Sequence, residues 1–245
     1  MTGLLTWPNV MSEPEQLLTE KRSGTLIATL HRPEVANALN VSLTRELTEV
    51  LNRAAESNVA LVVLKGTGSN FCGGFDLGSS AKDGPSSVTG HSREALTALE
   101  DLLQSVYEAP FMTAAFVQGG AIGSGADLVV ACDYAVATAD AHMSFPGFRA
   151  GVSLGTRRLV ELVGRRRADE MVVLGRSVRG EALHESGLVS MMAEEAEWPE
   201  VLARLAESAA GDALRCRVRF NEIAKSVSRE RSANDLRSSI GKAVG

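Results

Sequence analysis

The chain has 245 residues, of which 44% are hydrophobic, and its 25 basic and 30 acidic residues give a formal net charge of −5. This length supports a buried core without disulfides or metals, and the composition is typical of a globular rather than a disordered protein. The densest basic cluster, residues 165–167, is much shorter than the roughly 5–8 residues of a basic nucleic-acid patch. We therefore expect no nucleic-acid partner.

The cysteines and the N-terminal segment bear on metal content and location. Cys72, Cys132 and Cys216 are odd in number and lack CxxC spacing, which argues against a disulfide framework and a zinc site. Residues 1–20 contain acidic residues and prolines rather than a basic start and an apolar run. No window reaches the roughly 18 apolar residues of a membrane span. We expect a cytoplasmic protein with no metal and no membrane segment.

The predicted elements begin with a strand over residues 25–30, which is rich in β-forming residues and ends before Pro33. Residues 41–55 follow with apolar side chains at spacings of mostly three and four, the period of a helix. The short apolar run 60–64 is typical of a strand buried on both faces. A strand, a helix and a strand in this order predict a right-handed parallel crossover.

The same rhythm is repeated after a long polar segment. Residues 66–90 are rich in Gly, Ser and Asp, and a loop of this length inside a compact domain is usually functional or mobile. Beyond it, the sequence predicts a helix through 96–106, a strand at 113–117, a helix over 126–131 and a strand at 134–137. After residue 155 the apolar spacing predicts helices without long intervening strands. The fold class is therefore α/β with a helical C-terminal region.

Two glycine-rich segments are the candidates for chemistry. In residues 71–77 a Gly-Gly pair follows a buried strand, and in residues 118–128 four glycines lead into a helix. On spacing alone the first is better explained by a tight turn, but glycine lets backbone N–H groups approach a ligand, and a helix N-terminus adds unbonded N–H groups. The spacing does not match the GxGxxG of a dinucleotide site, and no P-loop sequence is present. Two backbone donors on separate loops are what an oxyanion hole requires.

With these segments the chain resembles the crotonase superfamily, the enoyl-CoA hydratase/isomerase family, over nearly all of its length. Four motifs in the family's order carry the resemblance. They are Arg32-Pro33 through Asn37-Ala38-Leu39-Asn40, similar to an RPxxxNAL loop; residues 71–77, similar to F-(S/C)-(A/G)-G-x-D-(L/I); residues 119–133, similar to G-x-A-x-G-G-G-x-E-L followed by C-D; and residues 159–189, similar to RL…VG…A…L.G…A…GLV helices.

The resemblance implies a crotonase-like β/α spiral core over residues 1–190 and a helical region over 191–245 for closure and trimerisation. It implies an acyl-CoA or acyl-carrier thioester as partner, with CoA as part of the substrate and no separate cofactor, and a homotrimer or a dimer of trimers. The thioester carbonyl would accept hydrogen bonds from the backbone N–H groups of Phe75 and Ser124, which would stabilise an enolate. The residues implied in substrate binding are Ala38, Gly73, Gly74, Asp76 and Leu77.

The chain departs from the family at both catalytic positions. Family hydratases use two glutamates to activate water, whereas here the first position is Asp127 and the second is Gly147. Asp can act as a general base, although its reach is shorter than that of Glu. Residues 151–159 form a shorter loop than the family's, which implies an altered acyl pocket.

Four other side chains near these motifs are candidates for structural or functional roles. Asp76 is expected to orient its loop by accepting backbone N–H bonds, and Asp133 to act as a cap. His91 is either an acyl-pocket residue that titrates near neutral pH or a solvent-facing helix residue. Lys82 is either a CoA phosphate contact or a solvated loop residue.

Three hypotheses about function remain open. The first is an enzyme that stabilises an enolate in an oxyanion hole, with Asp127 as its acid or base; one carboxylate suits a proton shift between C2 and C4 better than water addition. The second is a catalytically degenerate crotonase-fold protein that binds a thioester or serves as a partner subunit, with Asp127 capping a helix. The third is a specialised decarboxylase or dehydratase that acts on a carrier-bound acyl group.

Overall fold

The computed structural model describes residues 15–76, 93–150, 152 and 154–211. Their strands form a six-stranded sheet in the order β1-β2-β3-β4-β6-β9 and a three-stranded sheet in the order β5-β7-β8. The strands are β1 (Leu17–Arg22), β2 (Thr25–Leu30), β3 (Leu61–Gly66), β4 (Met112–Val117), β5 (Gly120–Ile122), β6 (Tyr134–Ala137), β7 (His142–Ser144), β8 (Val178–Arg179) and β9 (Met191–Met192). The α-helices are α1 (Val41–Ala55), α2 (Arg93–Tyr107), α3 (Ser124–Ala131), α4 (Thr156–Val163), α5 (Arg165–Val172), α6 (Glu181–Glu185) and α7 (Trp198–Ala209). Short 3-10 helices are η1 (Pro33–Val35), η4 (Pro146–Ala150) and η5 (Glu195–Glu197).

The larger sheet is parallel after its first hairpin. β1 and β2 pair antiparallel, and every later neighbouring pair is parallel. β2, α1 and β3 form the predicted strand–helix–strand unit, and α1 has the predicted bounds because Asn40 fixes its start by accepting a hydrogen bond from Leu43 N at 2.7 Å. β1 was not predicted, since only its first two residues are aliphatic.

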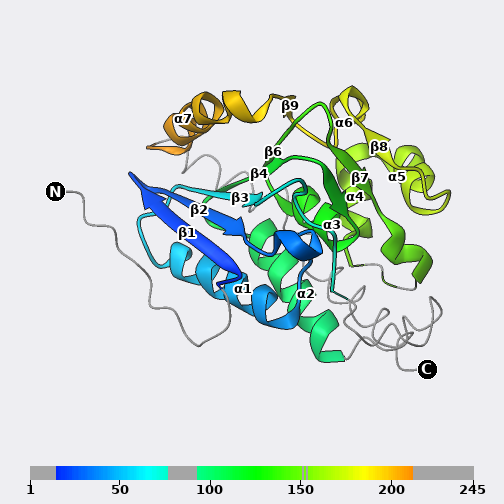
Figure 1. The fold of residues 1–245 in the computed structure, drawn as a ribbon, viewed down its shortest axis with the longest axis horizontal. Helices are drawn as coiled ribbons and strands as arrows, with labels where there is room; N and C mark the ends of the chain where they lie inside the picture. The colour runs from blue at the N-terminus through cyan, green and yellow to red at the C-terminus, as the bar shows by residue number, and fades with distance from the viewer. Residues whose placement is uncertain (1–14, 77–92, 151, 153, 212–245) are drawn as a thin grey trace.

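Helices cover both faces of the larger sheet (Figure 1). On one face α1 and α2 carry the apolar side chains of the main core, among them Leu43, Leu47 and Leu102. On the other face α7 covers β3 and β4, where the Trp198 and Phe116 rings meet edge to face with centroids 5.3 Å apart. Because parallel strands have their carboxyl ends at one edge of a sheet, the loops that follow β3 and β4 emerge as neighbours.

After residue 155 the described residues contain no long strand, as expected, but two strands of two residues each interrupt the helices. β8 pairs antiparallel with β7, and β9 pairs in parallel with β6 at the end of the larger sheet. A two-residue strand is too short to show an alternating apolar pattern, so the sequence carried no periodic signal for either. The predicted helical character of the rest is confirmed by α4, α5, α6 and α7.

Candidate active site

The two glycine-rich segments lie side by side beyond β3 and β4. Cys72 and Ala121 form an isolated parallel bridge. Cys72 N donates to Gly120 O at 3.0 Å, and Ile122 N donates to Cys72 O at 2.9 Å. We call this pairing of residue 72 with residues 120–122 the loop seam.

Gly125, in the first turn of α3, lies against the loop seam. A Cβ added at this glycine would lie 2.3 Å from Cys72 O and 2.8 Å from Cys72 Cβ. Both distances are far below van der Waals contact, and the first obstacle is backbone that cannot rotate away. Glycine at this position therefore lets α3 begin directly against the other loop.

The loop seam brings together the two residues implied as oxyanion donors. A Cβ added at Gly74 would lie 2.7 Å from Ile122 O and 3.8 Å from Ser124 N, so the peptide that ends at Phe75 N borders the N-terminus of α3. The chain turns sharply here, with φ of +101° at Gly74 and +54° at Gly123. Ser124 is the first residue of α3, where backbone N–H groups have no acceptor within the helix. Their use as oxyanion donors stays a prediction.

Ser124 replaces the glycine that the family resemblance led us to expect. Its side chain is buried, and its Oγ has no hydrogen-bond partner among the described residues. A buried hydroxyl without a partner costs about 1–3 kcal/mol. The backbone N–H at this position is unaffected by the side chain, so the substitution leaves the candidate donor in place.

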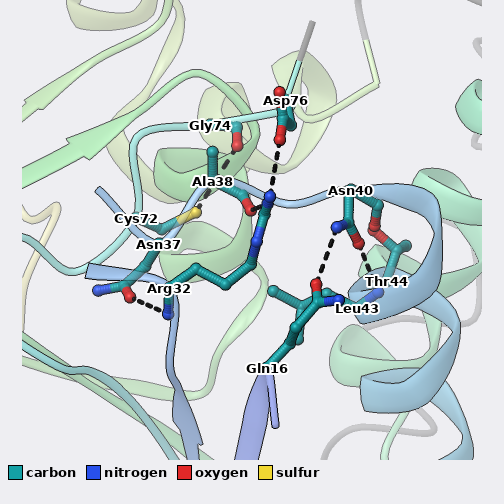
Figure 2. A network of polar contacts seen from close by, with 10 residues as sticks. All are labelled: Gln16, Arg32, Asn37, Ala38, Asn40, Leu43, Thr44, Cys72, Gly74 and Asp76. Carbon is teal, nitrogen blue, oxygen red and sulfur yellow. Dashed lines mark hydrogen bonds and ion pairs between the residues drawn. The ribbon is translucent and has the colours of Figure 1, made fainter. Parts of the chain in front are cut away.

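A polar network joins the first two motifs (Figure 2). The structure describes four of the five residues implied in substrate binding, namely Ala38, Gly73, Gly74 and Asp76; Leu77 lies outside the described residues. Arg32 Nη1 donates to Ala38 O, and Arg32 Nη2 lies 3.0 Å from Asp76 Oδ2. Leu39 N donates to Gly74 O at 2.8 Å, and Asp76 N donates to Leu39 O at 2.7 Å. The carboxylate of Asp76 thus has a guanidinium partner that sequence spacing did not reveal.

Asn37 supports the site and was not singled out from the sequence. Its side chain is fully buried and its φ is +55°, a left-handed conformation that Asn tolerates better than most residues. Its Nδ2 donates to Thr67 O and Asn70 O, both at 2.8 Å, while its Oδ1 accepts from Arg32 N at 2.9 Å. The feature of the sequence that could have indicated this role is the place of Asn37 in the Asn-Ala-Leu motif. The amide fixes the turn that presents Ala38.

Asp127 lies in the first turn of α3 and faces the start of α4. A Cβ added at Gly155, the residue that precedes α4, would lie 1.8 Å from Asp127 Oδ1 and 2.2 Å from Asp127 Cγ. The carboxyl group therefore occupies the space that any other side chain at position 155 would need. Burial raises the pKa of Asp127 to about 7; the nearby Arg158 charge lowers this pKa and the Glu100 charge raises it. Near neutral pH such a group can both accept and donate a proton.

A buried ion pair between Arg158 and Glu100 lies near Asp127. Arg158 Nη2 is 2.9 Å from Glu100 Oε1 and donates to Gln104 Oε1 at 2.7 Å, and the side chains of the pair are 1% and 6% exposed. Arg158 Nη1 donates to Leu154 O at 3.3 Å. Sequence patterns did not indicate this pair, because 58 residues separate its members and both types are usually exposed.

The second catalytic position holds no carboxylate. Gly147 lies in η4 and has no positive φ, and a Cβ added there would be 3.5 Å from Val152 O, an ordinary contact. Asp133 Oδ2 accepts from Thr113 N in β4 at 3.0 Å, so its carboxylate ties the end of α3 to the sheet; its predicted role as a cap stays a prediction. His91 and Lys82 lie outside the described residues.

Cys72, at the centre of the loop seam, is fully buried. Burial raises the pKa of its thiol to about 12, opposed in part by hydrogen bonding with the backbone of Gly74 and Leu39. At neutral pH the group is therefore a thiol rather than a nucleophilic thiolate. It is a packing residue of the site.

One groove of the described part of the chain lies away from Asp127, Phe75 and Ser124. A groove of about 690 Å³ lies between α1 and α2; it is lined by Arg45, Thr48, Glu49, Glu94, Thr97, Ala98 and Asp101. Within the described ranges, no three His, Cys, Asp or Glu side chains lie close enough to hold a metal ion. Nor is any helix of those ranges long and apolar enough to cross a membrane.

Gly155→Ala is expected to displace the Asp127 carboxylate, because the new Cβ would overlap Oδ1. We expect turnover of the thioester that the family resemblance implies to fall about 10²-fold, as a misplacement of about 1 Å can cause, and unfolding free energy to fall by about 1–3 kcal/mol. Steady-state kinetics and urea unfolding measure the two effects. Gly147→Ala is the matched control, since a Cβ there meets only ordinary contacts. Equal activity of both variants would show that the position of Asp127 is unimportant.

An α/β core with a loop seam between neighbouring strand ends and one buried carboxylate at the next helix defines the site, and comparison with known proteins identifies the family. The family model described as enoyl-CoA hydratase/isomerase matches residues 20–237. The chain belongs to the enoyl-CoA hydratase/isomerase family. The resemblance to the crotonase superfamily that the motifs indicated is thereby confirmed.

Individual relatives support this assignment. The chain is 36% identical over 173 residues to a "Probable enoyl-CoA hydratase" of Rhodobacter capsulatus, an alignment that covers 69% of this chain and 65% of that protein, slightly less than two thirds. It is 32% identical over 179 residues to the 2,3-dehydroadipyl-CoA hydratase of Escherichia coli, covering 71% and 68% of the two chains. A solved structure described as an enoyl-CoA hydratase/isomerase from Bordetella parapertussis superposes with a TM-score of 0.84 at 30% identity, covering 94% of this chain and 93% of that one. The predicted crotonase-like α/β fold is confirmed.

Proposed function

We propose that this protein is an acyl-thioester enzyme, acting on an acyl-CoA, that stabilises an enolate between the backbone N–H groups of Phe75 and Ser124. The loop seam is the observation that carries the proposal, because it places the peptide of Phe75 beside the first N–H of α3. Preorganised donors of this kind stabilise negative charge as it develops on an oxygen. CoA enters as part of the substrate, and no separate cofactor takes part in the reaction.

A proton shift along the acyl chain is the reaction that one carboxylate serves best. With a 3-enoyl thioester, Asp127 as carboxylate removes a proton from C2, and the electron pair moves to the thioester oxygen to give a dienolate. The Asp127 acid then returns the proton to C4, which yields the 2-enoyl thioester and regenerates the carboxylate. The pKa of about 7 supports both steps near neutral pH.

The test is turnover of purified protein with a 3-enoyl-CoA and with crotonyl-CoA, followed at the absorbance of the conjugated enoyl thioester. We expect absorbance to rise with the 3-enoyl substrate and to fall much more slowly, through hydration, with crotonyl-CoA. No change above background with either substrate would refute the proposal. Sedimentation of the same preparation would test the proposed homotrimer or dimer of trimers.

A catalytically degenerate thioester-binding protein is the second candidate, and Gly147 is the observation that favours it. Position 147 lacks the second carboxylate, although its backbone conformation and surroundings accept a Cβ. Such a protein would bind acyl-CoA in calorimetry and turn over neither substrate. A decarboxylase or dehydratase of carrier-bound acyl groups would also be inactive in this assay and is tested with carrier-loaded substrates.

Gly147→Glu is expected to increase hydration of crotonyl-CoA at least about tenfold, because a second positioned carboxylate typically contributes 10²–10⁴-fold when its geometry is right. Isomerisation should change little. The matched control is Gly147→Gln, which has the same length without the charge. A gain in Gln as large as in Glu would contradict acid–base action by the new side chain.

A further inference from the structure

Arg158 is held in one orientation by three acceptors, two on α2 and one in the segment before α4. Its guanidinium contacts two side chains of α2, the carboxylate of Glu100 at 2.9 Å and the amide oxygen of Gln104 at 2.7 Å. It also contacts Leu154 O, in the segment before α4, at 3.3 Å. Its guanidinium also lies 5.3 Å from the centroid of the Tyr107 ring. A guanidinium with a 1% exposed side chain and several fixed partners cannot relax toward solvent, so its charge acts on whatever lies next to it.

Asp127 is the group next to this ion pair. Its carboxyl touches Gly155 at the start of α4, and Arg158 follows in the first turn of the same helix. α2, α4, β4 and β5 all pack against α3. Neither β4 nor β5 has a titratable residue.

The other charged side chains that the structure describes on α2 and α4 are Glu94, Asp101, Arg157 and Glu161. On α2, Glu94 and Asp101 line the groove toward α1. On α4, Arg157 is half-buried, and the exposed Glu161 accepts a hydrogen bond from Tyr107. Arg158 and Glu100 are thus the described charged groups whose fields act most strongly on Asp127.

We propose that Arg158 is a positioning residue for Asp127 and that Glu100 tempers its charge, so that the buried pair controls the protonation of the Asp127 carboxylate. The proposal rests on the proposed function, since it concerns the group that moves the proton there. An unopposed guanidinium would hold Asp127 ionised and make it a weak base. Without the guanidinium, burial would keep Asp127 protonated and unable to accept a proton. The ion pair keeps Asp127 between these two extremes, so that its carboxyl group can both accept and donate a proton.

The test is direct titration of the Asp127 carboxyl carbon by NMR in protein labelled with carbon-13 at aspartate Cγ, with the signal assigned from its loss in Asp127→Asn. Glu100→Gln is expected to lower the titration midpoint by about one pH unit, and Arg158→Gln to raise it by about one unit. Arg158→Lys keeps the charge and should restore a midpoint within about half a unit of the wild type. The acid limb of the isomerisation rate should move with the midpoint.

Asp101→Asn is the matched control, because it removes a carboxylate from the position next to Glu100 on α2 that faces the groove toward α1. It should leave the midpoint unchanged. If Arg158→Gln does not fold, Glu100→Gln and Arg158→Lys decide the question. An unchanged midpoint in Glu100→Gln, or an equal shift in Asp101→Asn, overturns the proposal. Because the titration needs no turnover, an inactive wild type with the expected shifts would refute the proposed function and leave this inference standing.

Discussion

Asp127→Asn is expected to lower kcat for isomerisation of a 3-enoyl-CoA by about 10²–10⁴-fold, the usual contribution of a positioned acid or base. The amide keeps the size of the carboxylate and cannot accept the C2 proton. Binding of acyl-CoA, measured by calorimetry, should change little, because the proposed oxyanion donors are backbone groups. Wild-type turnover by the variant would show that another group moves the proton.

The same substitution is expected to change the pH dependence of stability. Burial raises the pKa of Asp127 from 3.8 to about 7, so between these pH values the folded protein binds more protons at this site than the unfolded chain. Stability from this group therefore falls as pH rises from about 4 to about 7, and the penalty is complete above pH 7. The difference in pKa corresponds to a few kcal/mol, on the order of 4.

Urea unfolding of wild type and Asp127→Asn at several pH values checks this sign. We expect the variant to be the more stable protein at pH 8 and the advantage to disappear below about pH 4. Asp101→Asn provides the comparison for an exposed carboxylate. A variant that loses stability at pH 8 would show that Asp127 is ionised in the folded state at little cost.

Gly125→Ala is the second substitution with a large expected effect. Its Cβ would meet the backbone oxygen of Cys72 at 2.3 Å, so the two loops must separate or α3 must shift. Overpacking of this kind costs about 1–3 kcal/mol or more. Displacement of one oxyanion donor costs about 10²–10³-fold in kcat. We expect both effects.

Ala126→Gly serves as the control for Gly125→Ala, because it perturbs the same turn of α3 without adding an atom at the loop seam. It should cost about 1–2 kcal/mol, from lower helix propensity and from the loss of one buried methyl group, and little activity. Thermal unfolding and steady-state kinetics separate the two variants. If Gly125→Ala were as active and as stable as Ala126→Gly, the close approach at the loop seam would have no part in the function.

Local patterns predicted the parts of the fold that depend on local chemistry. The apolar period predicted α1, and the glycines of residues 71–77 and 118–128 indicated the loops that form the seam. The pattern at β1 was obscured by polar residues, and β8 and β9 were too short to show one. These strands exist because tertiary contacts supply partners that periodicity does not report.

For the candidate site too, sequence motifs predicted some residues, whereas others depend on tertiary contacts. Asp127, Phe75 and Ser124 were assigned from the resemblance, and the structure brings the segments that bear them together. The pair Arg158–Glu100 was missed, because its members are distant in sequence and a buried ion pair has no sequence period. The environment that sets the charge of Asp127 is thus a product of helix packing.

The buried thiol at the loop seam has a consequence for how the site's motions are observed. Cys72 is fully buried at the loop seam, so a thiol reagent reaches its sulfur only after a local opening of the structure. In protein whose other cysteines are replaced, the rate at which a reagent labels this sulfur would measure how often the loop seam opens. Cys72, which has no proposed role in the chemistry, would therefore report how rigidly the loop seam is held.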